Sequence, residues 1–200
     1  MEHRPAKGKR SFIMATKAPT QTRETWLTAA LEQLREHGSG GLAIDKIARR
    51  LGVTRGSFYH HFDNLEGLIE ELPTHWMHRF APVPFEVAVE WEPTMEGYVR
   101  RLVCDFIPNM GRMRYDLAMR AWAQMDEAAS RAVCEVDAAR LEMLTRFFRH
   151  FGCGDCAEPS AMLAYSMIVG VDGVCGWGPQ ERELVAEQIM AIQRSCRSPH

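Results

Sequence analysis

Residues 51–62 have the sequence LGVTRGSFYHHF. A glycine stands at position 52, a small polar run begins at Thr54, and every position from 58 to 62 carries a ring. A buried helix does not need the polar run, and a surface helix has no use for so many rings. The stretch therefore predicts a segment with one buried face and one face that contacts another molecule.

The residues around this stretch have helical spacing. Four apolar residues before the glycine share one helix face: Ile44, Ile47, Ala48 and Leu51. Gly52 is typical of a helix C-terminus, and Thr54 is a favourable N-cap for a second short helix that ends at His60 or His61. Two short helices joined by a tight turn that contains glycine predict a helix-turn-helix unit.

The second short helix has a polar face suited to DNA. Phe58 and Phe62 are expected to hold it against its neighbours, which leaves six residues outside: Thr54, Arg55, Gly56, Ser57, Tyr59 and His60. Hydroxyl groups bind phosphates, Arg and His side chains reach base edges, and a glycine lets a backbone approach closely. We predict that these six residues contact double-stranded DNA. An ordinary helical hairpin with an exposed polar face would give the same pattern.

The rest of the chain also predicts helices. One is expected over residues 22–36, and Asp63 with Glu66 resembles a capping box that opens another, which Pro73 should kink or break. Residues 81–93 contain three prolines and predict a linker or irregular structure. Further helices are expected over residues 94–108, 113–124, 127–151, 159–175 and 180–195. The predicted fold is all-α, with a three-helix N-terminal head and a larger helical body.

Charge is distributed unevenly along the chain. Residues 1–62 hold 11 Lys and Arg residues against 5 acidic ones, whereas residues 63–200 hold 13 against 21. A basic N-terminal part suits a polyanionic partner, although a solvated basic tail gives the same count. No run of about 18 apolar residues exists, and the apolar part of residues 1–19 is too short for a signal peptide. These features predict a cytoplasmic protein without a membrane span.

The segment IDKIARRLGVTRGSFYHHFDNLEGLIEEL resembles the DNA-binding head of TetR-type transcriptional repressors. The residues that match the family pattern are Ile47, Ala48, Gly52, Val53, Thr54, Gly56, Ser57, Tyr59, His61, Phe62 and Leu68. The helix expected over residues 22–36 also resembles the first helix of that family. Family members usually carry Thr where this chain has Ala43, and often Lys where it has Leu65. Two contacts to the DNA backbone are therefore expected to be lost, unless the basic N-terminal residues replace them.

The resemblance implies a division into three parts. Residues 1–19 would be a basic, flexible arm, residues 20–80 the helix-turn-helix DNA-binding domain, and residues 81–200 a helical ligand-binding and dimerisation domain. It also implies a homodimer that binds a palindromic operator, most often as a repressor, and is released by a small-molecule inducer. The alternative is a helical protein that binds small molecules or senses redox state or metals, with weak or no DNA binding.

Two sets of apolar residues in the body predict further contacts. Aromatic and thioether side chains predict a site for an apolar or aromatic ligand, although such residues often form ordinary core. The ligand candidates are Trp91, Tyr98, Phe106, Met119 and Trp122. The last two expected helices have apolar faces that predict a four-helix dimer interface, with packing inside one chain as the alternative. The interface candidates include Met162, Tyr165, Ile168, Leu184, Val185, Ile189 and Ile192.

One motif offers other chemistry. Cys153 and Cys156 form a CxxC pair, whose sulfurs are close enough for a metal or a disulfide. A tetrahedral metal site needs a second pair of ligands, and no other CxxC exists, so a plain loop with two free thiols is expected. Redox or metal sensing is the alternative. The sequence shows no Ser-His-Asp arrangement, phosphate-binding glycine loop or paired metal motif, and we expect no catalytic residues, resident metal or cofactor.

Overall fold

The computed structural model describes residues 21–82, 85–106, 112–171 and 178–197. Every regular element in these ranges is a helix, and none of these helices is long and apolar enough to cross a membrane. The basic arm predicted at residues 1–19 lies outside the described residues. The elements are α1 (Arg23–His37), η1 (Ser39–Gly41), α2 (Ile44–Leu51), η2 (Arg55–His60), α3 (Leu65–Phe80), α4 (Phe85–Trp91), α5 (Met95–Arg100), η3 (Arg101–Phe106), α7 (Arg112–Ala123), α8 (Glu127–His150), η4 (Gly154–Cys156), α9 (Ala157–Val171) and α10 (Pro179–Arg197). The all-α fold predicted from the sequence is confirmed.

The head is built on one buried ring. Phe58 of η2 is completely buried. Its ring meets the indole of Trp26 in α1 edge-on, with 5.3 Å between ring centroids, and stacks on the ring of Phe62, with 5.4 Å between centroids. Burying such a ring contributes about 1.5–3 kcal/mol, and each favourable ring pair adds about 0.5–1.5 kcal/mol. These contacts confirm that Phe58 and Phe62 hold the short helix against the rest of the head.

The ends of the first two helices follow from their sequences. Thr22 caps α1, and its hydroxyl group accepts a hydrogen bond from the N–H of Thr25, whose own side chain completes the capping box. Gly52 ends α2 in the left-handed conformation, with φ of 69°, which favours glycine. Ala43 occupies the N-cap position of α2 and offers no side-chain cap. The helix therefore begins without the hydroxyl group that the family usually provides there.

The start and the course of α3 differ from the predictions. Its N-cap is Asn64, whose side-chain oxygen accepts a hydrogen bond from the N–H of Gly67 at 2.8 Å, so the capping box expected from Asp63 and Glu66 is wrong. The helix also continues through Pro73, which was expected to kink or break it. Proline removes one backbone hydrogen bond here, and Pro73 itself is buried together with Leu72 and Trp76, whose core packing holds the helix.

The segment expected to be a linker is helical instead. Residues 85–91 form α4, and its first ring, that of Phe85, meets Phe147 and His150 of α8 edge-on at 6.2 and 5.7 Å. Ala88 is buried. The three prolines of this segment, at positions 82, 84 and 93, favoured irregular structure. Packing against α8 nevertheless gives the residues between them a helical structure. The prediction failed because tertiary contacts override local preference.

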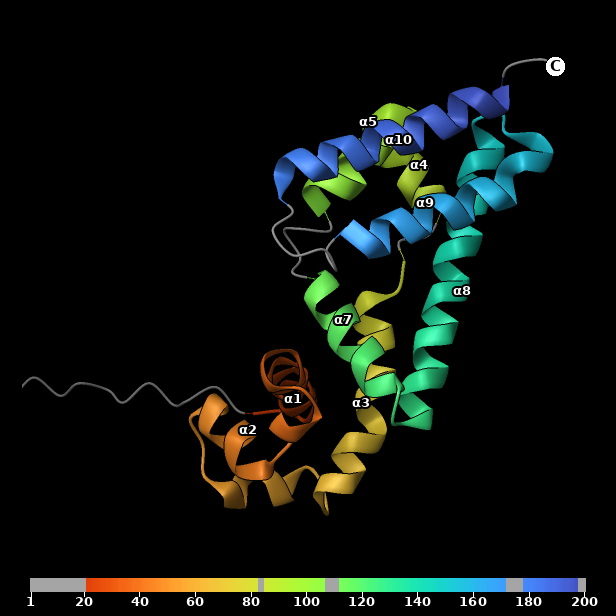
Figure 1. Ribbon diagram of the computed structural model, residues 1–200. Coiled ribbons are helices and arrows are strands. Elements are labelled where there is room, and N and C mark those ends of the chain that lie inside the picture. Colours follow the sequence, from red (N-terminus) through yellow and green to blue (C-terminus); the bar gives the residue numbers. More distant parts are fainter. Residues whose placement is uncertain (1–20, 83–84, 107–111, 172–177, 198–200) are drawn as a thin grey trace, which may run out of the picture.

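Two hydrophobic cores share helix α8. The first joins the head to α3, α7 and the first half of α8, and it includes Trp26, Phe58, Leu68, Met119, Trp122 and Val133. The second lies under α5, the second half of α8, α9 and α10, and it includes Val99, Phe147, Ala161 and Ile189. Figure 1 shows α8 running from the region of α3 and α7 to the region of α9 and α10. The head thus packs on the body through a common core, and the division at residue 80 stays a prediction.

A buried polar network fixes the end of α3 on the body. Arg140 of α8 pairs with Asp116 of α7 at 2.5 Å, and it also donates a hydrogen bond to the carbonyl oxygen of Phe80, the last residue of α3, at 3.3 Å. Both charged side chains are buried. The Tyr165 hydroxyl group of α9 accepts a hydrogen bond from Arg140 and donates one to Asp137 of α8. Four helices are therefore tied together at one point.

We expect Arg140→Ala to lower the free energy of unfolding by about 3–5 kcal/mol, because it leaves the carboxylate of Asp116 buried and without its partner. The matched control is Arg131→Ala on the same helix. Arg131 forms an exposed pair with Glu127 one turn away, so its loss should cost less than about 0.5 kcal/mol. Urea denaturation followed by circular dichroism measures both variants. Equal losses would contradict the structural role given to the buried pair.

Candidate nucleic-acid interface

The structure places the six predicted DNA-contacting residues on the outer side of η2. Thr54, Arg55, Gly56, Tyr59 and His60 are exposed, and Ser57 is half-buried. Tyr59 is 51% exposed although its ring meets the buried Phe58 edge-on at 5.4 Å. The element therefore has the two faces that the sequence predicted, with the rings of Phe58 and Phe62 inside and the short polar residues outside.

Helix η2 is a 3₁₀ helix, and it begins without a side-chain cap. Thr54 occupies the N-cap position as predicted, but its hydroxyl group makes no cap hydrogen bond. A hydroxyl group at an exposed helix N-terminus can donate to a phosphate, and the free backbone N–H groups of the first turn point the same way. Both features leave hydrogen-bonding capacity at the leading end of η2.

Arg55 is held loosely at this leading end. Its guanidinium group is 3.4 Å from the carboxylate of Asp45 in α2, and both side chains are more than half exposed. A hydrogen bond with Tyr59 and the charge of Asp45 raise the pKa of Arg55. An exposed pair of this kind contributes little stability, so the guanidinium group is free to exchange its partner for a phosphate or a base edge.

Helix α2, next to η2, carries exposed cationic residues that are not among the six residues predicted from the sequence to contact DNA. Lys46 and Arg49 are both exposed, and with Gln33, His37 and Arg50 they line a groove of about 430 Å³ between α1 and α2. The Lys46 ammonium group donates to the carbonyl oxygen of Gly40 at 2.9 Å, whereas Arg49 forms no ion pair with any described residue. In the sequence DKIARR, Lys46 and Arg49 are three residues apart, and this spacing indicates that they share one exposed helix face.

Among the described residues, none comes close enough to require a glycine at position 56. A methyl group added there would meet only the Thr54 hydroxyl oxygen, at an ordinary 3.8 Å. The backbone of Gly56 therefore lies open to whatever approaches the outer face of η2.

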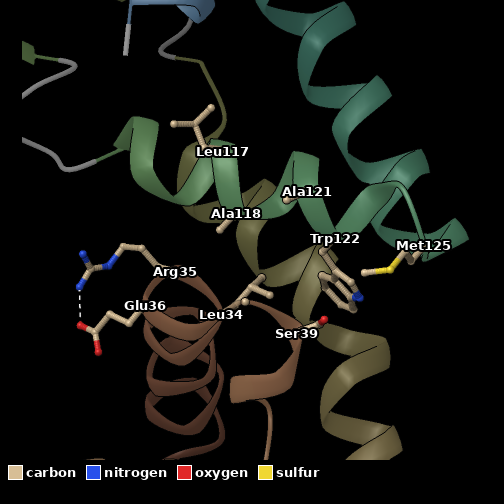
Figure 2. Close-up of a pocket in the computed structure, with 10 residues that line it drawn as sticks. Leu34, Arg35, Glu36, Ser39, Leu117, Ala118, Ala121, Trp122 and Met125 are labelled. Carbon is tan, nitrogen blue, oxygen red and sulfur yellow. Dashed lines mark hydrogen bonds and ion pairs between the residues drawn. The ribbon is translucent and has the colours of Figure 1, made fainter. Parts of the chain in front are cut away.

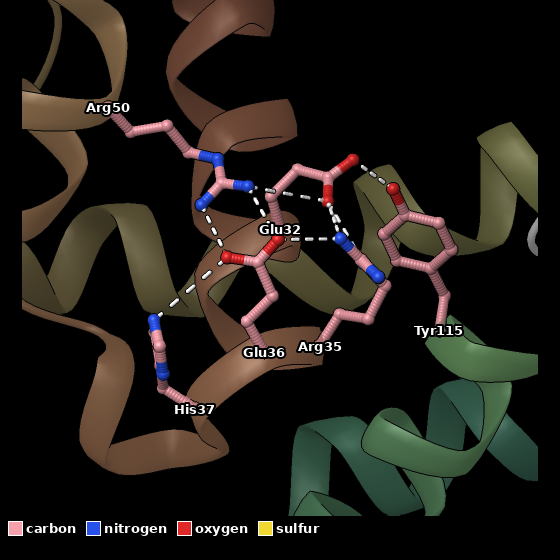
Figure 3. A network of polar contacts seen from close by, with 6 residues as sticks. All are labelled: Glu32, Arg35, Glu36, His37, Arg50 and Tyr115. Carbon is pink, nitrogen blue, oxygen red and sulfur yellow. Dashed lines mark hydrogen bonds and ion pairs between the residues drawn. The ribbon is translucent and has the colours of Figure 1, made fainter.

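A network of charges and hydrogen bonds joins the head to α7, as Figure 3 shows. Tyr115 of α7 donates a hydrogen bond to Glu32 of α1, and Glu32 also binds Arg35 at 2.8 Å. Glu36, one turn further along α1, accepts two hydrogen bonds of 2.7 Å from Arg50 of α2. Burial and the bond to Glu32 raise the pKa of Tyr115 to about 12. The first helix of the helix-turn-helix is therefore connected through α1 to the body.

Of the three ligand candidates whose side chains are described, Met119 and Trp122 lie in one core and Tyr98 lies in the other. Met119 is fully buried in the core shared with the head. Tyr98 lies in the other core, where it stacks on Phe147 at a centroid distance of 3.8 Å beside a void of about 10 Å³. The side chains of Trp91 and Phe106 lie outside the described part of the chain.

Trp122 borders a larger cavity between α1 and α7. The groove measures about 610 Å³, and its lining residues are Leu34, Arg35, Glu36, Gly38, Ser39, Leu117, Ala118, Ala121, Trp122 and Met125. Figure 2 shows the ring of Trp122 reaching from the end of α7 toward Ser39, and Met125 in the turn that follows α7. Leu117 and Met125 leave 37% and 77% of their surface exposed. This groove lies where the head meets the body.

Only some of the interface candidates predicted from the sequence are exposed on α9 and α10. Val185 and Ile189 are buried within the chain's own core, so this part of α10 packs internally. Met162 and Leu163 of α9 and Leu184 of α10 remain 62%, 52% and 58% exposed. These three residues are the large apolar side chains that the two packed helices present to the outside within the described ranges.

The two cysteines of the CxxC motif face different ways. Cys153 is buried, and its thiol approaches the carbonyl oxygen of Gln193 at 3.9 Å, whereas Cys156 is exposed. Residues 21–82, 85–106, 112–171 and 178–197 contain no group of three or more His, Cys, Asp or Glu side chains placed to hold a metal ion.

Comparison with known proteins agrees with this geometry. Residues 27–72 match the family model described as bacterial regulatory proteins of the tetR family. A transcriptional regulator from Rhodococcus sp. Rha1 superposes with a TM-score of 0.69 at 16% identity, covering 90% of this chain and all of that one. A TetR regulator from Haloarcula marismortui gives 0.66 at 20% identity, covering 86% and 96%. A TetR-family regulator from Streptomyces coelicolor gives 0.64 at 19% identity, covering 88% and 96%.

A helix-turn-helix head on an all-α body defines a class of DNA-binding regulators, and the head of this chain matches one family within it. Residues 27–72 match the tetR family of bacterial regulatory proteins, and the whole chain shares its fold with solved regulators of that family. The resemblance found in the residues from Ile44 to Leu72 is thereby confirmed.

We expect Gly56→Ala to weaken DNA binding at least tenfold while leaving the free energy of unfolding unchanged or slightly higher. The added methyl group has space within the chain but would stand between η2 and a DNA backbone. Gly40→Ala is the matched control, because Gly40 is exposed and a methyl group there meets nothing within 4 Å. Mobility shift and urea denaturation measure both variants. Equal affinity of Gly56→Ala and the unchanged protein would remove η2 from the interface.

We expect Tyr115→Phe to lower the free energy of unfolding by about 1 kcal/mol at pH 8, because Glu32 loses a hydrogen-bond donor. The phenol has a raised pKa in the folded protein, so its contribution is complete below the ordinary tyrosine pKa and is lost as the pH rises through about 12. The difference between variant and unchanged protein should therefore shrink above pH 10. Urea denaturation at pH 8 and pH 11 tests this. A difference that is constant with pH would contradict it.

Proposed function

We propose that this protein is a ligand-responsive repressor that binds a palindromic DNA operator as a homodimer. The observation that carries the proposal is the two-faced η2 helix, which buries Phe58 and exposes Thr54, Arg55, Tyr59 and His60. The exposed side chains have the hydrogen-bonding groups that DNA contacts require, and the cations of α2 add phosphate contacts on the same unit. An all-helical regulator of this family works in the cytoplasm, where its DNA is.

The exposed apolar residues of α9 and α10 support a homodimer. Met162, Leu163 and Leu184 lie on two helices that pack against each other, and α9 also exposes Ser166 and Gly170 on its outer surface. Small residues beside large apolar ones allow two helix pairs to approach closely as a four-helix interface. A twofold axis through this interface places two heads so that each η2 faces one half of a palindrome.

The joint between α1 and α7 is the proposed place where effector binding and DNA binding are coupled. The groove beside Trp122 is within the usual size range of small-molecule sites, and its exposed apolar residues suit an apolar or aromatic effector. Tyr115 lies on the same helix as Trp122, and its hydroxyl group donates a hydrogen bond to Glu32 of the head. An effector that separates α7 from α1 would therefore disturb the head and lower its affinity for the operator. Because the two binding events are coupled, bound DNA would lower the affinity for the effector by the same factor.

The alternative function is a helical sensor with weak or no DNA binding. One observation favours it, which is that Ala43 leaves the N-terminus of α2 without a side-chain cap or a hydroxyl group for a phosphate. The exposed Lys46 and Arg49 on the same helix act against it, because they provide cations for the DNA backbone. TetR regulators are generally not enzymes, and no catalytic role is proposed for any residue.

Selection of bound sequences from random duplex DNA tests the proposed function. We expect enrichment of an inverted repeat whose half-site centres are about 34–36 Å, one duplex turn, or a small multiple of it apart. The same selection with Arg55→Ala should recover weaker sites with relaxed preference at one base pair of each half-site. Failure to enrich any sequence at low salt would favour the alternative sensor.

A further inference from the structure

The fold brings together two cysteines that are far apart in the sequence. Cys156 directly precedes the first residue of α9, and Ser160 follows it by four residues on the same helix face. The Ser160 hydroxyl oxygen lies 3.1 Å from the sulfur of Cys196, near the end of α10. The thiol of Cys153, three residues before Cys156, approaches the carbonyl oxygen of Gln193, three residues before Cys196, at 3.9 Å. Contacts with the end of α10 therefore lie on both sides of Cys156 in the sequence. The exposed member of the CxxC motif is thus next to the part of α10 that carries Cys196.

The other member of the motif is directed elsewhere. Cys153 is buried, and its thiol approaches the backbone carbonyl oxygen of Gln193 on α10. A disulfide between Cys153 and Cys156 would require the buried side chain to leave this position. The structure therefore turns the two sulfurs that the sequence places closest in different directions, and it brings the start of α9, which follows Cys156, to Cys196.

We propose that Cys156 and Cys196 form an intrachain disulfide under oxidising conditions, tying the start of α9 to the end of α10. Both cysteines are reduced in the structure, Cys156 is exposed, and Cys196 is partly exposed, so an oxidant reaches the pair without unfolding. The bond would close a loop that contains most of α9 and α10. These two helices carry Met162, Leu163 and Leu184 on their outer faces.

A peroxide is the class of oxidant that balances the reaction. The Cys156 thiolate attacks one peroxide oxygen, the O–O bond breaks, and a sulfenic acid and water result. The Cys196 thiolate then attacks the sulfenic sulfur, the S–O bond breaks, the S–S bond forms, and the oxygen leaves as a second water with the released protons. The two thiols lose two electrons, which reduce one peroxide molecule to two waters.

The surroundings of Cys156 make the pair a slow sensor at neutral pH. The charge and the side chain of Cys196 raise the pKa of the Cys156 thiol, and the charge of Asp155 acts in the same direction. Because the thiolate is the attacking form, disulfide formation should accelerate about tenfold for each pH unit between pH 7 and 8. The pair therefore responds to sustained oxidation rather than to a brief pulse.

The test uses the full chain with Cys134→Ser, which removes another exposed thiol. After treatment with hydrogen peroxide, we expect a non-reduced peptide that links Cys156 to Cys196 within one chain. A loop of this length should raise the Tm by roughly 10 °C, and dithiothreitol should reverse the rise. Mass spectrometry of the digest and thermal unfolding by circular dichroism give the two readouts.

Three variants make the result specific. Cys156→Ser and Cys196→Ser should each abolish the linked peptide and the rise in Tm, whereas Cys153→Ala should keep both. Serine replaces an exposed or partly exposed thiol in the first two variants, so their Tm in the reduced state should match that of the parent protein. A peptide linking Cys153 to Cys156, a disulfide between two chains, or an unchanged Tm after complete oxidation would each overturn the proposal.

Discussion

The packing of Phe58 between Trp26 and Phe62 is the interaction on which the rest of the structure depends. It presses a helix of six residues against α1, although so short a helix has too few internal hydrogen bonds to be stable alone. Because the ring is on the inner side, the residues on either side of it point outward. The polar surface of the head is therefore a consequence of one buried aromatic cluster.

The same cluster belongs to a core that does not stop at the head. Met119, Trp122 and Val133 of the body pack in it together with the head residues, and the Arg140 network holds the end of α3 next to it. The polar contacts of Tyr115 and Glu32 run along its surface. A head joined in this way responds to small changes in α7, whereas a head on a loose linker would not.

The sequence predicted the head closely and the body only in outline. Gly52, the spacing from Ile44 to Leu51, and the rings at positions 58 and 62 specify local structure, so these predictions were confirmed. The helix at residues 85–91 was missed because it depends on Phe147 and His150, which lie some sixty residues away. The ligand candidates were chosen by chemical type alone, and residue type does not reveal that Tyr98 and Met119 lie in separate cores.

Helix α3 has a consequence for how far the head can move. It continues through Pro73 and ends where Arg140 holds the carbonyl oxygen of Phe80. Sixteen residues of helix span about 24 Å, so a tilt about Phe80 would be amplified along the helix. A tilt of about 10° at that end displaces the other end by about 4 Å, which exceeds the rise of one base pair.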